Sequence, residues 1–131
     1  MLKPIATAIF VLLAASGPLV GAEPLGATSV DGRYRVVLSG DLADAPIGPF
    51  LEYDFALTDA RGVRVDGAVV TIDGGMRHHG HGLPTTPQVE ALGDGRYRIV
   101  GLRFSMPGAW HIVLTVRTEE GMDRAEIEFV L

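Results

Sequence analysis

The sequence predicts an all-β fold, an antiparallel β-sandwich of about seven strands with a leader segment in front of it. Three observations support this prediction. Short segments alternate between apolar and polar residues, turn-forming dipeptides separate them, and no stretch repeats with the 3.6-residue period of an amphipathic helix. The clearest segment is Trp110–Thr118, in which every second residue from Trp110 to Val116 is large and apolar.

The expected strands in the first half of the chain follow one another between turns. Arg33–Ser39 begins after an Asp-Gly turn and alternates, as does Leu51–Thr58, which follows a loop with two prolines. Ala68–Asp73 is rich in Val, Thr and Ile, the residues that favour strands. Gly74–Pro87 reads as a long loop, because glycine and proline recur through it.

The second half of the chain continues the pattern. The expected strands are Val89–Leu92, Arg96–Phe104 after the Asp94-Gly95 turn, Trp110–Thr118 after a Met-Pro-Gly turn, and Arg124–Leu131 after a hairpin turn. This spacing is typical of an immunoglobulin-like sandwich, and a small barrel is the alternative. The chain has no cysteine, so Trp110 would pack without a neighbouring disulfide, and we expect Tyr53, Phe55 and Phe129 as its neighbours.

The N-terminus has the features of a secretory signal peptide. Lys3 precedes the uncharged run Ile5–Leu13, and the small residues Val20-Gly21-Ala22 follow. We expect residues 1–22 to be removed on export to the periplasm, residues 23–29 to form a flexible lead-in, and residues 30–131 to form one domain. An uncleaved membrane anchor is the alternative, although the apolar run is short of the about 20 residues that a span needs.

Composition and the lack of catalytic motifs argue against several classes of function. A net charge of −5 argues against nucleic-acid binding, and the absence of cysteine excludes thiolate metal sites and cysteine nucleophiles. No serine lies in a nucleophile elbow, and no glycine-rich phosphate loop opens a helix. We therefore expect the protein not to be an enzyme.

The loop at 74–87 holds the candidate functional residues. In an extended segment His79 and His81 would project to the same side, with Met76 just before them, and Met106 opens the Met-Pro-Gly turn. Imidazole together with soft thioether favours copper, Cu(I) in particular. The alternatives are a histidine-rich surface loop without a ligand and methionines that fill the core.

Other nearby side chains are weaker candidates. Asp73 could complete a zinc site, but two glycines separate it from the histidines. His111 is expected to be a solvated strand residue rather than a ligand. Whether His78 or His111 is a ligand is left open.

Two motifs resemble the YtkA-like domain, a family related to FixH. They are Met76-x-x-His79-x-His81-Gly82-x-Pro84-Thr85-x-Pro87 and Gly101-Leu102-x-Phe104-x-Met106-Pro107-Gly108-x-Trp110, with Gly95-x-Tyr97 between them, and the likeness spans Tyr53 to Val116. The resemblance implies a small exported or membrane-tethered β-sandwich with a theme of copper handling and of assembly of copper-containing terminal oxidases. Carried over by position, it implies Met76, His79, His81 and Met106 as metal ligands.

The resemblance also marks two departures. Arg77 stands where such motifs often have proline, which would weaken cation binding unless its side chain points away, and His78 lies outside the pattern.

The expected function is that of a periplasmic metal-binding protein for copper binding, delivery or resistance. Its expected partners are a copper ion and a copper-dependent envelope protein or oxidase-assembly factor, without nucleic acid and without stable membrane insertion after cleavage. The alternative is an accessory interaction module that assists assembly of an envelope or respiratory complex, for example by strand addition.

Overall fold

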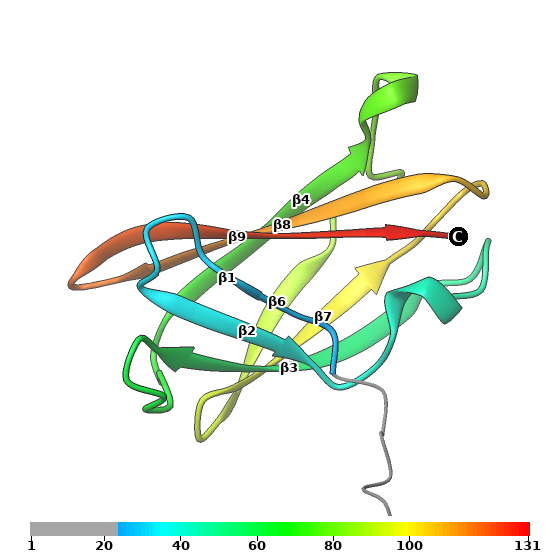
Figure 1. The fold of residues 1–131 in the computed structure, drawn as a ribbon. Helices are drawn as coiled ribbons and strands as arrows, with labels where there is room; N and C mark the ends of the chain where they lie inside the picture. The colour runs from blue at the N-terminus through cyan, green and yellow to red at the C-terminus, as the bar shows by residue number, and fades with distance from the viewer. Residues whose placement is uncertain (1–23) are drawn as a thin grey trace, which may run out of the picture.

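A computed structural model describes residues 24–131, which form two antiparallel sheets packed face to face (Figure 1). This architecture confirms the predicted β-sandwich. The predicted signal peptide, residues 1–22, lies outside the described residues. In residues 24–131, no helix has the length and apolar character that crossing a membrane requires.

Five strands form one sheet and four form the other. The first sheet has the order β1-β2-β3-β7-β6, with bounds β1 (Gly26–Thr28), β2 (Tyr34–Leu38), β3 (Leu51–Asp59), β6 (Gln88–Gly93) and β7 (Arg96–Leu102). The second has the order β5-β4-β8-β9, with bounds β4 (Val69–Met76), β5 (His81–Gly82), β8 (Ala109–Thr118) and β9 (Gly121–Val130). Two short 3-10 turns, η1 (Leu42–Asp44) and η2 (Arg77–His79), connect strands.

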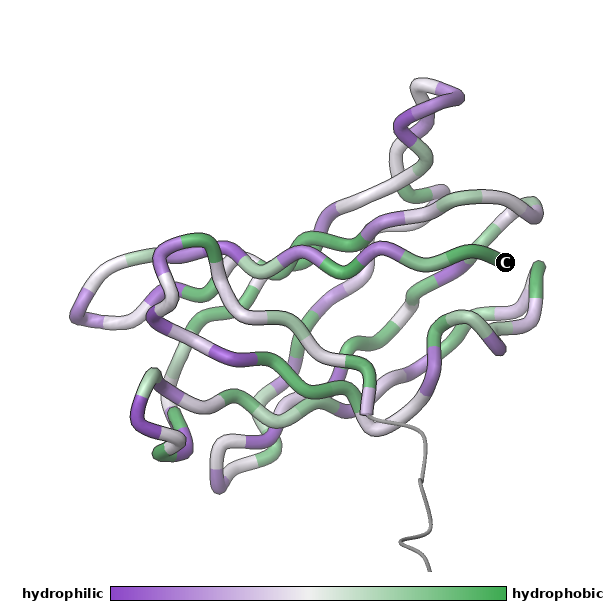
Figure 2. The backbone as a smooth tube through the Cα atoms, in the orientation of Figure 1, coloured by the Kyte–Doolittle hydropathy of each residue, from purple (hydrophilic) through white to green (hydrophobic). Residues whose placement is uncertain are grey.

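The longest strands, β8 and β9, show why the alternating segments form this sheet. Along β9 the backbone colour in Figure 2 alternates between hydrophilic and hydrophobic, as a strand with one buried face requires. Trp110 lies opposite Phe129 in the pairing of β8 with β9, and both side chains are buried. The register therefore places the two apolar rows on the same inner face of the sheet.

Aromatic rings fill the space between the sheets. Phe104 makes edge contacts with Trp110, at a ring distance of 5.1 Å, and with Phe129, at 5.2 Å. The expectation that Trp110 is buried near Phe129 is confirmed. Phe55 instead stacks on Tyr97, with ring centroids 5.3 Å apart.

Residues 24–131 form nine strands where about seven were expected, because β1 lies in the expected lead-in and β5 in the expected loop at 74–87. Residues 26–28 of the expected lead-in pair with β2 as the edge strand β1. β4 runs past Asp73 to Met76, because Gly74 and Gly75 take φ values of 154° and 146° and let neighbouring backbones approach closely. A Cβ at Gly74 would lie 2.2 Å from the His111 carbonyl oxygen, and one at Gly75 would lie 2.0 Å from that of His81. These glycines extend the sheet rather than begin a loop.

The sandwich has two ends, which we name for the loops they carry. The tip end holds the β2–β3 loop (residues 39–50), the β4–β5 tip (residues 77–80), the β7–β8 turn (residues 103–108) and the C-terminus. The far end holds the loops at residues 29–33, 60–68, 94–95 and 119–120. In Figure 1 the β4–β5 tip rises from the body of the sandwich at the tip end.

Candidate metal site

The β4–β5 tip brings Met76 and His81 to facing positions. β4 ends at Met76, η2 follows, and Gly80 turns the chain with φ 63° into β5. The two strands pair at Gly75 with Gly82 and at Met76 with His81. Residues directly opposite each other in an antiparallel pair project to the same face of the sheet. His81 therefore stands beside Met76 at the edge of the four-stranded sheet.

Met76 also meets the turn that contains Met106. Met76 is only 1% exposed. Its methyl carbon, Cε, packs on Gly108 so closely that a Cβ added to that glycine would lie 2.7 Å from it. The turn is held in place, because Trp110 Nε1 donates a hydrogen bond of 3.0 Å to the Met106 carbonyl oxygen. Gly108 and Leu131 also exchange two backbone hydrogen bonds of 2.9 Å. The turn at 106–108 thus packs on Met76, although 30 positions separate the two methionines.

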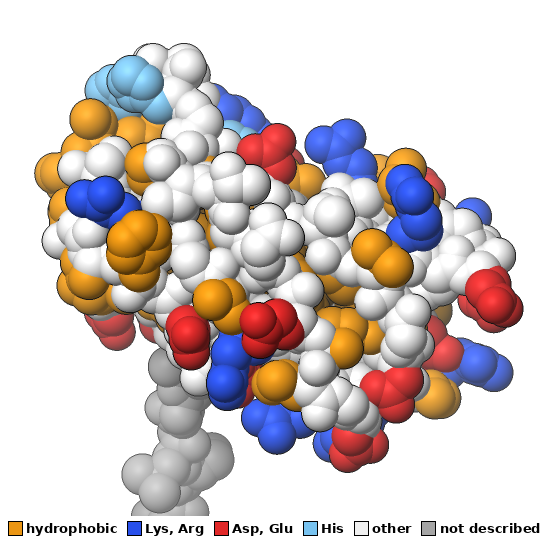
Figure 3. Space-filling model, turned by 180° about the vertical axis from the view of Figure 1, so that it is seen from behind, with side chains coloured by type: hydrophobic (Ala, Val, Ile, Leu, Met, Phe, Trp, Pro, Cys, Tyr) orange, Lys and Arg blue, Asp and Glu red, His pale blue; other side chains and the backbone are white. Residues whose placement is uncertain are grey.

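The two histidines of the expected pair lie together on the surface. The imidazoles of His79 and His81 are stacked, with centroids 6.1 Å apart and an angle of 14° between the rings. Both residues are exposed, and histidine side chains gather at one corner of the molecule in Figure 3. Gly80 turns the chain between them, so the segment is not extended as expected, yet the two rings remain neighbours. Met106 is half-buried, which leaves part of it accessible from outside.

Arg77 reaches away from this pair. Its guanidinium forms ion pairs with Glu126 and, at 2.6 Å, with Glu128, both on β9. β9 and β5 are opposite edges of the four-stranded sheet, so the arginine extends in the direction away from His81. Two carboxylates surround its positive charge, which lowers the electrostatic cost of a cation near the tip.

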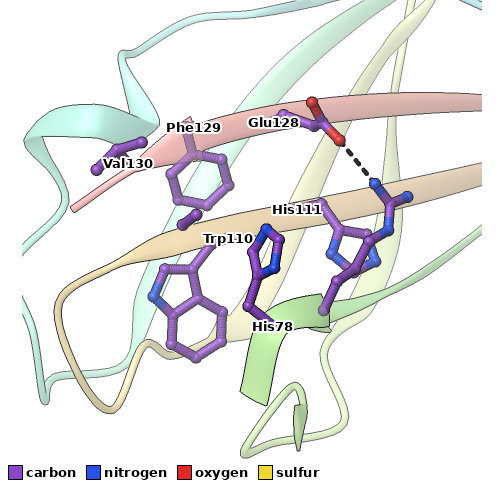
Figure 4. Close-up of a pocket in the computed structure, with 8 residues that line it drawn as sticks. His78, Trp110, His111, Glu128, Phe129 and Val130 are labelled. Carbon is purple, nitrogen blue, oxygen red and sulfur yellow. Dashed lines mark hydrogen bonds and ion pairs between the residues drawn. The ribbon is translucent and has the colours of Figure 1, made fainter. Parts of the chain in front are cut away.

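His78 and His111 form a separate group on the outer face of the sheet. Both line a pocket of about 280 Å³ together with Arg77 and Glu128 (Figure 4). His111 is half-buried rather than fully solvated. The position of His78 depends on the way in which η2 turns back over β8, and no local spacing rule predicts that contact.

Oxygen and nitrogen ligands alone do not form a ready metal site. Among residues 24–131, no three His, Asp or Glu side chains lie together in a way that could hold a metal ion. The carboxylate of Asp73, the residue considered for zinc, accepts a hydrogen bond of 2.8 Å from the Gly74 N–H. A multidentate site at the tip would therefore need the thioethers of Met76 and Met106 beside the two imidazoles.

The sequence model of the YtkA-like family matches residues 48–115, just over half of the chain. The protein belongs to the YtkA-like family. The match runs from the start of β3 into β8 and includes Met76, His79, His81 and Met106. No curated protein and no solved structure matches the chain. β9 lies outside the part matched to the YtkA-like model, so the two glutamates that hold Arg77 do as well.

Proposed function

We propose that this YtkA-like protein binds copper as cargo, favouring Cu(I), and delivers or sequesters it in the periplasm. Met76, His79, His81 and Met106 would hold the ion. The support is the family match over the segment that carries these residues, together with the chemistry of the donors. Thioether sulfur selects Cu(I), and imidazole accepts both oxidation states of copper.

The observation that carries the proposal is the position of Met76 between His81 and the turn that follows Met106. On one side it faces His81 across the β4–β5 pairing, and on the other its methyl group rests on Gly108 in the turn that follows Met106. A soft donor at this position has imidazoles at the surface and a second thioether in the adjoining turn. Arg77, the cation that could have opposed binding, is occupied by two glutamates on β9.

A Cu(I) titration against a competing chelator tests the proposal. The double variant Met76→Leu/Met106→Leu keeps similar side-chain volumes, so we expect it to fold. It should lose Cu(I) affinity strongly and Cu(II) affinity much less. His78→Ala is the matched control, because it removes an imidazole from the same tip and should leave Cu(I) binding unchanged.

Copper should also stabilise the fold. A ligand that binds only the native state adds about 2.7 kcal/mol at a hundredfold excess over its dissociation constant. We expect the melting temperature of the parent to rise with Cu(I) and that of the double methionine variant to stay constant. Equal Cu(I) affinity in the parent and the double variant would contradict binding through the thioethers.

An accessory interaction module is the second candidate function. It is favoured by exposed apolar residues at the tip end, where Phe50 is 70% exposed and the Arg103 guanidinium lies 5.8 Å from its ring. In that case the parent binds no copper, and Phe50→Ser disrupts association with an envelope or respiratory complex. The same copper titration therefore separates the two functions.

Export is the remaining part of the proposal. The charge-free run and the small residues before Glu23 support cleavage after Ala22. Mass analysis of the periplasmic protein should give Glu23 as its first residue. Recovery of residues 1–22 with the protein in the membrane fraction would favour the anchored alternative.

A further inference from the structure

The pocket beside η2 contains a second pair of imidazoles. It lies on the outer face of the four-stranded sheet, where η2 turns back over β8 and places His78 beside His111 (Figure 4). Ala109 and Val130, which face each other across β8 and β9, form part of its apolar lining. The stacked pair His79 and His81 takes no part in lining this pocket.

The register of the sheet leaves the space around His111 open. On one side His111 lies opposite Gly75 of β4, which has no side chain to cover the imidazole. On the other side it lies opposite Glu128 of β9, at a distance that lets facing side chains meet. Two imidazoles and one carboxylate therefore border a single pocket of about 280 Å³.

The charges around the pocket favour a cation. Arg77 and Glu128 line the pocket with one charge of each sign, and Glu126, which pairs with Arg77 from outside the lining, adds a second negative charge, so the three side chains together retain one negative charge. The Glu128 side chain is 70% exposed and can turn toward the pocket, because Arg77 keeps its ion pair with Glu126. Glu126 would then still neutralise the Arg77 guanidinium, while Glu128 contacts the bound metal ion.

We propose that His78 and His111 form a site for a borderline divalent cation such as Zn²⁺ or Cu²⁺. Glu128 is paired with Arg77 in the structure and is not in place as a ligand, so it would complete the site only after its carboxylate turns from Arg77 toward the two imidazoles. Neutral imidazole is the commonest metal ligand in proteins, and carboxylate completes many zinc sites. No sulfur lines the pocket, so the site has no preference for Cu(I). It is separate from the thioether site and does not depend on it.

Calorimetric titration with Zn²⁺ alone, at neutral pH and without copper, tests this site. The parent should bind one Zn²⁺ per chain, and His78→Ala and His111→Gln should each weaken binding about tenfold or more. That magnitude is a minimum, because even losing a residue that only supports a ligand costs about 10–100-fold. Glu128→Gln should weaken Zn²⁺ binding less than either histidine variant does.

The double variant His79→Ala/His81→Ala is the matched control, since it removes two imidazoles from the same tip and leaves the pocket intact. Its Zn²⁺ affinity should equal that of the parent. Melting curves without metal check that His111→Gln, a change at a half-buried position, still folds. The inference is overturned if the parent binds no Zn²⁺ or if the control loses as much affinity as the pocket variants.

Discussion

Side-chain hydrogen bonds tie the loops together at the far end of the sandwich, whereas packed aromatic rings support the tip end. At the far end the Asp123 carboxylate accepts hydrogen bonds from the Asp31 and Arg33 N–H groups, and Asp66 accepts one of 2.6 Å from Gly95. At the tip end Phe104 joins Trp110 and Phe129 beneath the turn at 106–108.

The difference separates stability from binding. At the far end the carboxylates of Asp123 and Asp66 fix the loops to one another. At the tip end the rings provide the support, so the histidines remain exposed and available. Substitutions at both ends test this division, beginning with the one of largest expected effect.

Removing the indole of Trp110 at the tip end should destabilise the fold most. Trp110→Ala should lower the free energy of unfolding by about 3–5 kcal/mol, as truncation of buried aromatic residues does. Urea unfolding followed by circular dichroism measures this loss. Trp110→Phe is the control, because it keeps a ring against Phe104 and removes the hydrogen bond to the Met106 carbonyl together with only part of the buried volume. A loss below that of Trp110→Phe would contradict support by packing.

Removing the Asp123 carboxylate at the far end should lower the free energy of unfolding somewhat less than Trp110→Ala does. Asp123→Ala leaves several N–H groups without an acceptor, and we expect a loss of about 2–3 kcal/mol in the same assay. Asp123→Asn keeps the shape and one acceptor oxygen, and it removes the charge and the second acceptor.

The Asp123 carboxyl also makes stability depend on pH. Burial alone would raise its pKa, but hydrogen bonds from the Ser29 hydroxyl and from the N–H groups of Arg124, Asp31 and Arg33 hold the pKa below the ordinary value. The ionised group therefore contributes stability above the unfolded pKa of about 3.9, and this contribution is lost as pH falls through the folded pKa. The unfolding free energy of Asp123→Asn should fall less on acidification than that of the parent. Parallel pH profiles would refute this role.

Substituting two glycines at the tip end distinguishes the cost of backbone strain from the cost of crowding against Met76. Gly48 and Gly108 both have positive φ, at 109° and 135°, but only at Gly108 would a Cβ meet another atom, the Met76 Cε. Gly48→Ala should cost about 1 kcal/mol through the backbone alone. Gly108→Ala should cost about 1 kcal/mol more through crowding and should also weaken Cu(I) binding. Equal losses of stability, with equal Cu(I) affinity, would mean that the turn does not press on Met76.

The smallest effect is expected from an exposed ion pair of the far end. Arg64 and Asp94 approach to 2.7 Å, but the Asp94 side chain is 84% exposed. Asp94→Asn removes the charge and tolerates the left-handed backbone at this position, where φ is 57°. The melting temperature should change by a few degrees at most, because water screens such pairs. A larger shift would show that charge, and not hydrogen bonding alone, organises the far end.

The strands were predictable from sequence wherever burial of one face imposes an alternation. Segments such as Trp110–Thr118 carry that signal over several residues, and the structure extends this one by only Ala109. β5 has only two residues and β1 only three, too few for any alternation to appear. Gly74 and Gly75 were misleading, because a glycine that permits close backbone approach looks in sequence like one that permits a turn.

The candidate site was predictable only where its residues are local. His79 and His81 are close in the sequence and their rings are neighbours as expected, although they meet across the Gly80 turn and not along an extended segment. The packing of Met76 against Gly108 depends on the sandwich as a whole, and so does the pocket shared by His78 and His111. Contacts between distant segments require the register of the strands, which composition and spacing do not contain.

The short pairing of β5 has a consequence for the timescale on which the tip opens. Two residue pairs attach β5 to β4, whereas ten attach β8 to β9. Amide hydrogens at residues 77–82 should exchange with solvent through brief local openings, while those in the middle of β8 exchange only when the whole domain unfolds. An ion held at the tip would slow the first set by closing those openings. Deuterium uptake along the chain would therefore record occupancy of the tip residue by residue.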